Sequence, residues 1–290
     1  MLKKRLVACL LIRDGLIVQS IGFSRYLPIG HPQFPLEFVA RWDVDEIVLL
    51  DISASSDERL LDIKLLEVLS TSCFVPLTVG GGIRSVEDVR KIIRAGADKV
   101  SINTSAIENP QLITDIANTF GSQCVVISMD CSVDDDGVYR VYANSGKSST
   151  GLVASDWAKK VESLGAGEIF LNSIDRDGLK TGYDIPLIKH ITDSVSIPVI
   201  VCGGVGDFSH FSPGIIEGGA SAVAAGNIFH YIEHSTIVAK MNLLQSGVDI
   251  RMDSEATYEG RKFDENGRLM MMSGEELSLV EFTKGFKDIL

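Results

Sequence analysis

Short apolar runs alternate with segments of helical periodicity along most of the chain. The runs are strand-length and rich in Val, Ile and Leu, whereas a segment such as "SVEDVRKIIRAG" (85–96) places its apolar residues at helical spacing. In that segment Ser85 and Asp88 resemble a capping box, and Gly96 suits the helix end. The pattern predicts eight strands, at 5–11, 46–51, 75–80, 98–103, 123–130, 167–172, 197–203 and 221–226.

Apolar strands separated by helices indicate a parallel sheet that is covered on both faces. Eight such units within 290 residues favour a closed (β/α)8 barrel, which we assign to residues 1–250. Residues 251–290 are expected to form an extension, with a hairpin signal at Asn266-Gly267 and a capped helical pattern over 273–290. That helix either packs on the barrel itself or docks a further protein.

The chain also repeats itself at an offset of 122 residues. "VPLTVGGGI" (75–83) matches "IPVIVCGGV" (197–205), and "DEIVLLDISAS" (45–55) matches "GEIFLNSIDRD" (167–177). The barrel is therefore expected to consist of two half-barrels with a two-fold repeat. The repeat also aligns Leu11 with Asp130, at an offset of 119, and the loop after the first strand accounts for the difference from 122. The first strand of each half therefore ends differently.

Glycine-rich or short polar segments follow several strands, at the barrel end where the chemistry of this fold is located. Glycines let backbone N–H groups approach an anion, and a following helix N-terminus favours negative charge. The related positions in the two halves predict two phosphate sites, although tight turns alone would also require glycine. The candidate residues are Gly81, Gly82, Asn103, Thr104, Gly178, Gly203, Gly204, Ala225 and Gly226.

Composition narrows the class of partner. The net charge of -12 and the pI near 4.9 argue against nucleic acid and anionic membranes as partners. The apolar runs are too short to span a membrane, and the N-terminus is not interpreted as a signal peptide. No cysteine pair has CxxC spacing and no histidine has metal-ligand spacing, so we expect reduced thiols, no metal, no cofactor and a cytoplasmic location.

Several motifs resemble the cyclase subunit of imidazole glycerol phosphate synthase over about residues 1–250. The resemblance implies a (β/α)8 barrel that binds a ligand with a phosphate at each end. It also implies a glutaminase partner at the N-terminal face of the barrel, whose ammonia crosses the barrel to the opposite mouth. The motifs are "LLDISAS", "VGGGIRS", "DKVSINTSA", "SGKSSTG", "GAGEIFLNSIDRDG" and "TGYD".

The same resemblance implies two inward acids that act as general acid and base. One maps onto Asp130, whereas the other maps onto Leu11, and a family lysine maps onto Gln19. Leucine cannot transfer a proton, and loss of a general base typically slows a reaction by about 10²–10⁴-fold. The cyclase (lyase) reaction is therefore expected to be impaired, with Asp51 and Asp177 as the other candidate catalytic carboxylates.

Charged residues stand at the starts of four predicted strands: Arg5, Glu46, Lys99 and Glu168. The resemblance implies that these four form a ring in the barrel floor through which ammonia enters, and that Asp98 faces the glutaminase. For any one of them, a surface charge facing water would be the simpler interpretation. The balanced set of two cations and two anions favours the gate.

Three functions remain open at this point. The first is ammonia delivery to a separate ATP-using amidotransferase that converts an acetamido group on a nucleotide-linked sugar into an acetamidino group, in surface-polysaccharide (lipopolysaccharide or O-antigen) biosynthesis. It rests on Leu11, Gln19 and the altered loop 22–35. The second is an authentic cyclase of histidine biosynthesis. The third, a stand-alone sugar-phosphate isomerase, is disfavoured because such an enzyme needs no opening in its floor.

Overall fold

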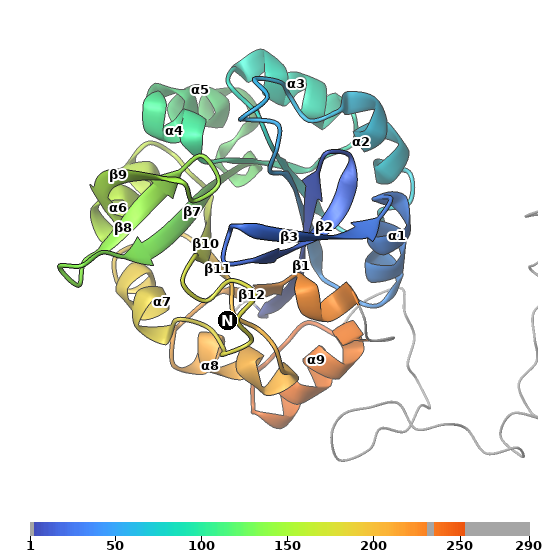
Figure 1. The fold of residues 1–290 in the computed structure, drawn as a ribbon, viewed down its shortest axis with the longest axis vertical. Coiled ribbons are helices and arrows are strands. Elements are labelled where there is room, and N and C mark those ends of the chain that lie inside the picture. The colour runs from blue at the N-terminus through green and yellow to red at the C-terminus, as the bar shows by residue number, and fades with distance from the viewer. Residues whose placement is uncertain (1–2, 231–234, 253–290) are drawn as a thin grey trace, which may run out of the picture.

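A closed ring of parallel strands forms the centre of the protein, as the computed structural model shows for the residues that it describes, 3–230 and 235–252 (Figure 1). The strand order is β10-β11-β12-β1-β4-β5-β6-β7, and pairing of β7 with β10 closes the ring. The eight strands are β1 (Arg5–Arg13), β4 (Glu46–Asp51), β5 (Leu77–Gly80), β6 (Lys99–Ile102), β7 (Val125–Val133), β10 (Glu168–Ser173), β11 (Val199–Cys202) and β12 (Ala222–Ala225). The predicted (β/α)8 barrel is confirmed, and each predicted strand lies on an observed one.

Helices surround the strands on the outside of the ring (Figure 1). They are α1 (Gln33–Arg41), α2 (Ile63–Ser70), α3 (Val86–Arg94), α4 (Thr104–Glu108), α5 (Gln111–Phe120), α6 (Ala154–Ser163), α7 (Ile185–Thr192), α8 (Phe211–Ile216) and α9 (Ser235–Gln245). The predicted cap of α3 is present, because the Ser85 hydroxyl accepts a hydrogen bond from the backbone N–H of Asp88 at 3.2 Å. The Asp88 carboxylate in turn accepts from the Ser85 hydroxyl at 2.8 Å.

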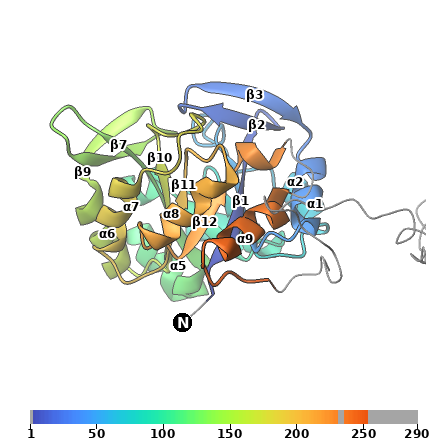
Figure 2. The same ribbon diagram turned by 90° about the horizontal axis from the view of Figure 1, so that it is seen from below.

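Two β-hairpins extend the barrel at its C-terminal end. In the first half, β2 (Leu16–Ile21) and β3 (Arg25–Gly30) continue β1 through antiparallel pairing of Leu11 with Val18. In the second, β8 (Tyr139–Ala143) and β9 (Ser148–Val153) continue β7. Figure 2 shows β2 and β3 at the end of the barrel opposite the N-terminus.

Segment 22–35, interpreted as a loop from the sequence, therefore contains β3 and the start of α1. The signal that indicates the hairpin is Asp14-Gly15, where both residues have positive φ, at 51° and 79°. That geometry suits the two-residue turns whose twist matches the flanking strands, and Asp-Gly is a favoured sequence for them.

The two-fold repeat places Leu11 and Asp130 at equivalent positions. Leu11 pairs with Leu50 on the next barrel strand, and Asp130 pairs with Asn172. Leu50 and Asn172 are themselves related by the 122-residue repeat. Position 11 is thus the structural counterpart of the acid.

The barrel interior is filled by side chains, as expected for eight strands. A fully apolar group occupies its middle and is separate from the larger core between strands and helices. Its members are Val7, Cys9, Val48, Val126, Phe170, Ile200, Ala222 and Ala224.

The described chain returns to its own beginning near residue 250, where Ile250 forms a parallel bridge with Lys4. The expected hairpin and helix of the extension lie outside the described residues, and the division at residue 250 stays a prediction. Among the helices of the described residues, none is long and apolar enough to cross a membrane.

A buried ion cluster ties α9 to the base of the barrel. The ammonium group of Lys240, which is fully buried, lies 2.9 Å from Asp45 and 3.4 Å from Asp43. Asp45 also accepts a hydrogen bond from the backbone N–H of Leu6 at 2.7 Å. Burial raises the pKa of Asp45, and Lys240 opposes that effect.

We predict that Lys240→Met destabilises the fold by about 3–5 kcal/mol, because it removes the cation that lies 2.9 Å from the buried carboxylate of Asp45. Urea unfolding measures this. The matched control is Lys91→Met, since Lys91 forms an exposed pair with Asp88 at 3.5 Å and should change stability by less than about 1 kcal/mol. Equal effects of the two substitutions would contradict a stabilising role for the cluster.

Candidate functional site

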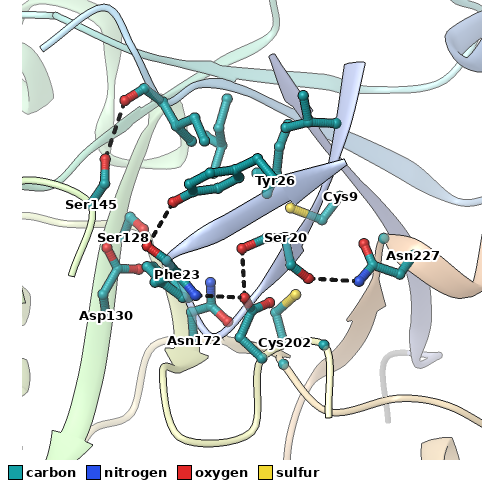
Figure 3. A pocket seen from close by; sticks show the side chains of 18 of the residues that line it. Cys9, Ser20, Phe23, Tyr26, Ser128, Asp130, Ser145, Asn172, Cys202 and Asn227 are labelled. Carbon is teal, nitrogen blue, oxygen red and sulfur yellow. Dashed lines mark hydrogen bonds between the residues drawn. The ribbon is translucent and has the colours of Figure 1, made fainter. Parts of the chain in front are cut away.

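A pocket opens at the C-terminal ends of the barrel strands, beneath the β2–β3 hairpin (Figure 3). Residues from both halves of the repeat line it, so closure of the barrel brings together segments that lie far apart in the sequence. The predicted site residues that line the pocket are Asp51, Gly81, Asn103, Thr104, Asp130, Asp177, Gly178, Gly203, Gly204, Ala225 and Gly226. Gly82 does not line it.

Asp130 is a buried acid in the pocket wall. Its carboxylate accepts one hydrogen bond, from the Asn103 side-chain amide at 2.8 Å. Burial raises the pKa of Asp130 to about 7, the negative charge of Asp177 adds to the rise, and the bond from Asn103 opposes it. A carboxyl group with this pKa can hold or release a proton near neutral pH, as a general acid or base must.

Asp177, in the loop after β10, is a second carboxylate of the pocket and is bonded to the hairpin. It accepts hydrogen bonds from the Ser20 hydroxyl at 2.6 Å and from the backbone N–H of Phe23 at 3.1 Å. Burial raises its pKa, and these donors oppose the rise. Sequence patterns do not indicate the contact with Ser20, because the two residues are 157 positions apart.

Asp51 also lines the pocket, but its oxygens are already engaged. One oxygen accepts from the backbone and hydroxyl groups of Ser53 and from the backbone N–H of Ala54, at 2.8–3.1 Å. Arg59 forms an ion pair with the other at 2.7 Å. These bonds suit Asp51 to shaping its loop better than to proton transfer.

The side of the pocket that carries position 11 is largely apolar. Leu11 lies among Cys9, Leu50 and Cys202, which belong to or pack against the apolar interior. Gln19, at the position of the family lysine, is buried, and its amide donates to the backbone carbonyl of Asn227 at 3.3 Å. Neither Leu11 nor Gln19 therefore supplies an ionisable group to this side.

The glycines of the candidate phosphate loops are required by close backbone packing. Gly82 and Gly204, which are equivalent in the repeat, have φ values of 69° and 104°. A Cβ atom at Gly82 would lie 1.8 Å from the carbonyl oxygen of Arg59, and one at Gly204 would lie 2.2 Å from that of Gly182. The geometry thus explains these glycines without a ligand, and the phosphate sites stay a prediction.

At the opposite end of the barrel, the structure joins the four predicted floor charges in one ring. Arg5 pairs with Glu46 and Glu168, and Lys99 lies 3.0 Å from Glu46 and 2.9 Å from Glu168. Both carboxylates are buried. Each carboxylate contacts both cations, so the charges are mutually neutralised, whereas the predicted function of the ring as an ammonia gate is not tested by this geometry.

Polar side chains connect this ring with the pocket along one wall of the interior, a feature that the sequence analysis missed. The Thr78 hydroxyl donates to Glu46 at 2.8 Å. Ser101 and Ser128 follow on β6 and β7 and line the pocket, and within the described part of the chain the buried hydroxyl of Ser101 has no hydrogen-bond partner. The alternation of strand side chains could have indicated them, since Thr78, Ser101 and Ser128 each lie between two apolar residues of the same strand.

Asp98 is exposed beside the ring, at the turn before Lys99. One of its carboxylate oxygens accepts from the backbone N–H of Leu77 at 2.8 Å. Its other oxygen makes no hydrogen bond among the described residues, so a partner protein could reach it, although its predicted contact with a glutaminase is untested.

The five cysteines are free in this structure. No group of three or more His, Cys, Asp or Glu side chains within residues 3–230 and 235–252 has the arrangement of a metal site.

The sequence matches the family described as "Histidine biosynthesis protein" over residues 5–235. A protein of Vibrio vulnificus (strain YJ016), provisionally named imidazole glycerol phosphate synthase subunit hisF2, is 46% identical over 268 residues, which cover 92% of this chain and 98% of the relative. The imidazole glycerol phosphate synthase subunit HisF of Alkaliphilus metalliredigens (strain QYMF) is 47% identical over 251 residues, which cover 87% of this chain and all of the relative.

The raised pKa of Asp130 predicts a pH-dependent cost to stability. Because the folded-state pKa of about 7 exceeds the usual value of 3.8, the folded protein binds more protons than the unfolded chain between these pH values, and its stability falls as pH rises through that window. Asp130→Asn removes this pH-dependent contribution to the free energy of unfolding. We expect urea unfolding to show that, on going from pH 4.5 to pH 8, the free energy of unfolding of Asp130→Asn increases relative to that of the unmodified protein. The relative increase at the higher pH should be up to about 4 kcal/mol.

The control for that experiment is Asp135→Asn, because Asp135 is exposed in the β7–β8 turn and its side chain makes no hydrogen bond or ion pair among the described residues. A gain for Asp130→Asn that is the same at both pH values would contradict the raised pKa.

Proposed function

The chain belongs to the histidine biosynthesis protein family, and we propose that within it the protein is the HisF-type barrel subunit of a glutamine amidotransferase. In this function a glutaminase docks at the floor of the barrel and releases ammonia there. The ammonia crosses the barrel and meets a phosphorylated ligand in the pocket. The observation that carries the proposal is the closed ring of Arg5, Glu46, Lys99 and Glu168 at the floor.

The polar wall above the ring supports a path for ammonia. Ammonia needs hydrogen-bond partners where it leaves water, and an unpartnered buried hydroxyl such as that of Ser101 can provide one. The opposite side of the interior is apolar. A neutral molecule that can donate and accept hydrogen bonds fits such a path better than an ion does, because a charge would be poorly solvated there.

The two groups of glycine-containing loops support a ligand with an anionic group at each end. Gly81, Asn103 and Thr104 follow the adjacent strands β5 and β6, whereas Gly178, Gly203 and Gly226 follow the adjacent strands β10, β11 and β12. The two groups lie on different sides of one pocket. A ligand that spans the pocket would place its middle beside Asp130.

Two functions are compatible with the delivery of ammonia to this pocket. The names of the two relatives favour the cyclase of imidazole glycerol phosphate synthase, and we propose that this chain performs that reaction slowly. The replacement of an acid by Leu11 is the observation that favours the other candidate, delivery of ammonia to an ATP-dependent sugar amidotransferase. The relatives' names give that second candidate no support.

The cyclase proposal predicts that turnover is low and that it increases when Leu11 is replaced by an acid. With ammonium and the ribulosyl substrate of the family, the protein should turn over about 10²–10⁴-fold more slowly than a family member with an acid there. Leu11→Asp should recover part of this deficit, whereas Leu11→Asn, similar in size but unable to transfer a proton, should not. Turnover of the unmodified protein at the family's ordinary rate would contradict the requirement for that acid.

The gate proposal predicts a loss of coupling when the ring is broken. In the complex with its glutaminase, Lys99→Ala should leave glutamine hydrolysis intact but lower the product formed per glutamine, because it leaves two buried carboxylates with one cation fewer. Added ammonium should bypass part of the defect.

The matched control for Lys99→Ala is Lys91→Ala, because Lys91 is exposed on α3 and lies outside the ring. If both variants yield as much product per glutamine as the unmodified complex, the ring does not control the passage of ammonia.

A further inference from the structure

The β2–β3 hairpin is hydrogen-bonded to two loops of the opposite half of the barrel. Besides the Ser20–Asp177 bond, the Asn227 side-chain amide donates to the carbonyl oxygen of Ser20 at 2.8 Å (Figure 3). The hairpin also packs against the loop after β10, because a Cβ atom at Gly178 would lie 2.5 Å from that same carbonyl oxygen. Ser20 is therefore held from three sides, and its hydroxyl is directed at the Asp177 carboxylate.

Asp177 and Asp130 face one pocket from neighbouring strands. Asp130 lies on β7 and Asp177 follows β10, and these two strands pair directly. The two carboxylates have different surroundings. Asp177 accepts from two donors on the hairpin, Ser20 and Phe23, whereas Asp130 accepts from Asn103 alone.

We propose that Asp130 and Asp177 are the proton-transfer pair of this site, in place of a pair that includes an acid at position 11, and that Ser20 of the hairpin positions Asp177. This inference rests on the proposed function, since it assigns the groups that serve the proposed reaction of ammonia.

The different surroundings give the two carboxyl groups different parts in the reaction. Hydrogen bonds from Ser20 and Phe23 favour the ionised form of Asp177, which can accept a proton from the attacking nitrogen. Asp130, deeper and with fewer donors, holds a proton near neutral pH and can give it to the departing group. In this step the nitrogen lone pair forms a C–N bond, and the bond from that carbon to the departing group breaks with its electron pair. The nitrogen gives one proton to Asp177, and the departing group receives one from Asp130. Proton transfer from Asp177 to Asp130 through water then restores the pair.

Other titratable groups face the pair from the surrounding elements. Cys9 on β1, Tyr26 on β3 and Cys202 on β11 line the same pocket, and Asp51 on β4 is paired with Arg59. The contact with Cys202 and burial raise the pKa of Cys9, burial raises the pKa of Tyr26, and the charges of Asp177 and Asp130 add to both rises, so these two groups stay neutral when the carboxyl groups titrate. Lys180, in the loop after β10, also lines the pocket.

The test is Ser20→Ala with Ser24→Ala as the matched control. Ser24 belongs to the same hairpin but its exposed hydroxyl donates to the carbonyl of Ile21, away from Asp177. Carboxyl titrations by NMR on the full chain should show the pKa of Asp177 rising by about one unit in Ser20→Ala and unchanged in Ser24→Ala. Ser20→Thr keeps the hydroxyl and should restore the titration of the unmodified protein.

Turnover with ammonium and the ribulosyl substrate completes the test. The acid limb of the pH–rate profile should move to higher pH in Ser20→Ala, and Asp177→Asn and Asp130→Asn should each lower turnover by about 10²–10⁴-fold. Asp177→Asn should also lower the pKa of Asp130, because it removes a nearby negative charge.

Three results would overturn the inference. The first is a titration of Asp177 that is the same in Ser20→Ala and Ser24→Ala. The second is full turnover in Asp177→Asn. The third is absence of turnover in the unmodified protein, which would remove the reaction that the pair serves. Coupling of glutamine hydrolysis to ammonia transfer through the ring would still report separately on the rest of the proposed function.

Discussion

The hydrogen bonds that close the sheet between β7 and β10 are the constraint on which the rest of this structure depends. Closure tilts the strands and directs alternate side chains into a small interior. It also gathers every strand start at one end of the barrel and every strand end at the other. The four floor charges, the apolar middle and the pocket are therefore three successive layers of the barrel interior. An open sheet would enclose none of them.

The levels differ in how polar groups are satisfied. At the floor, two cations and two carboxylates neutralise one another, so buried charge is tolerated. In the middle, apolar side chains fill most of the column and hydroxyl groups are confined to one wall. At the mouth, burial and the charge of Asp177 raise the pKa of Asp130 to about 7, and its hydrogen bond from Asn103 only partly opposes that rise. The acid at the mouth has few hydrogen-bond donors, which suits proton transfer there. The charges of the floor ring are neutralised by one another, which suits the passage of ammonia.

Position 11 shows how a repeat can lose symmetry without losing its fold. Leu11 and Asp130 occupy equivalent places, yet leucine joins the apolar group formed with Cys9 and Leu50, whereas the acid remains in a polar wall beside Asn172. Leucine in this place avoids the burial of a second carboxylate, which would be costly without a partner. As a result, β1 contributes no carboxyl group to the pocket, and Asp130 and Asp177, the candidate proton-transfer groups, both belong to the second half-barrel.

The sequence by itself determined the barrel, its eight strands and the repeat, because strand and helix periodicities are local and each half repeats the other. It also fixed the difference between Leu11 and Asp130. The family resemblance indicated which four charges form the ring. Only the tertiary structure decided that Ser20 bonds to Asp177, that Asp51 is engaged by Arg59, and that the candidate phosphate glycines are required by backbone packing. Those contacts join residues from different strands and loops, and their geometry is set by barrel closure and by the Asp14-Gly15 turn, neither of which local periodicity specifies.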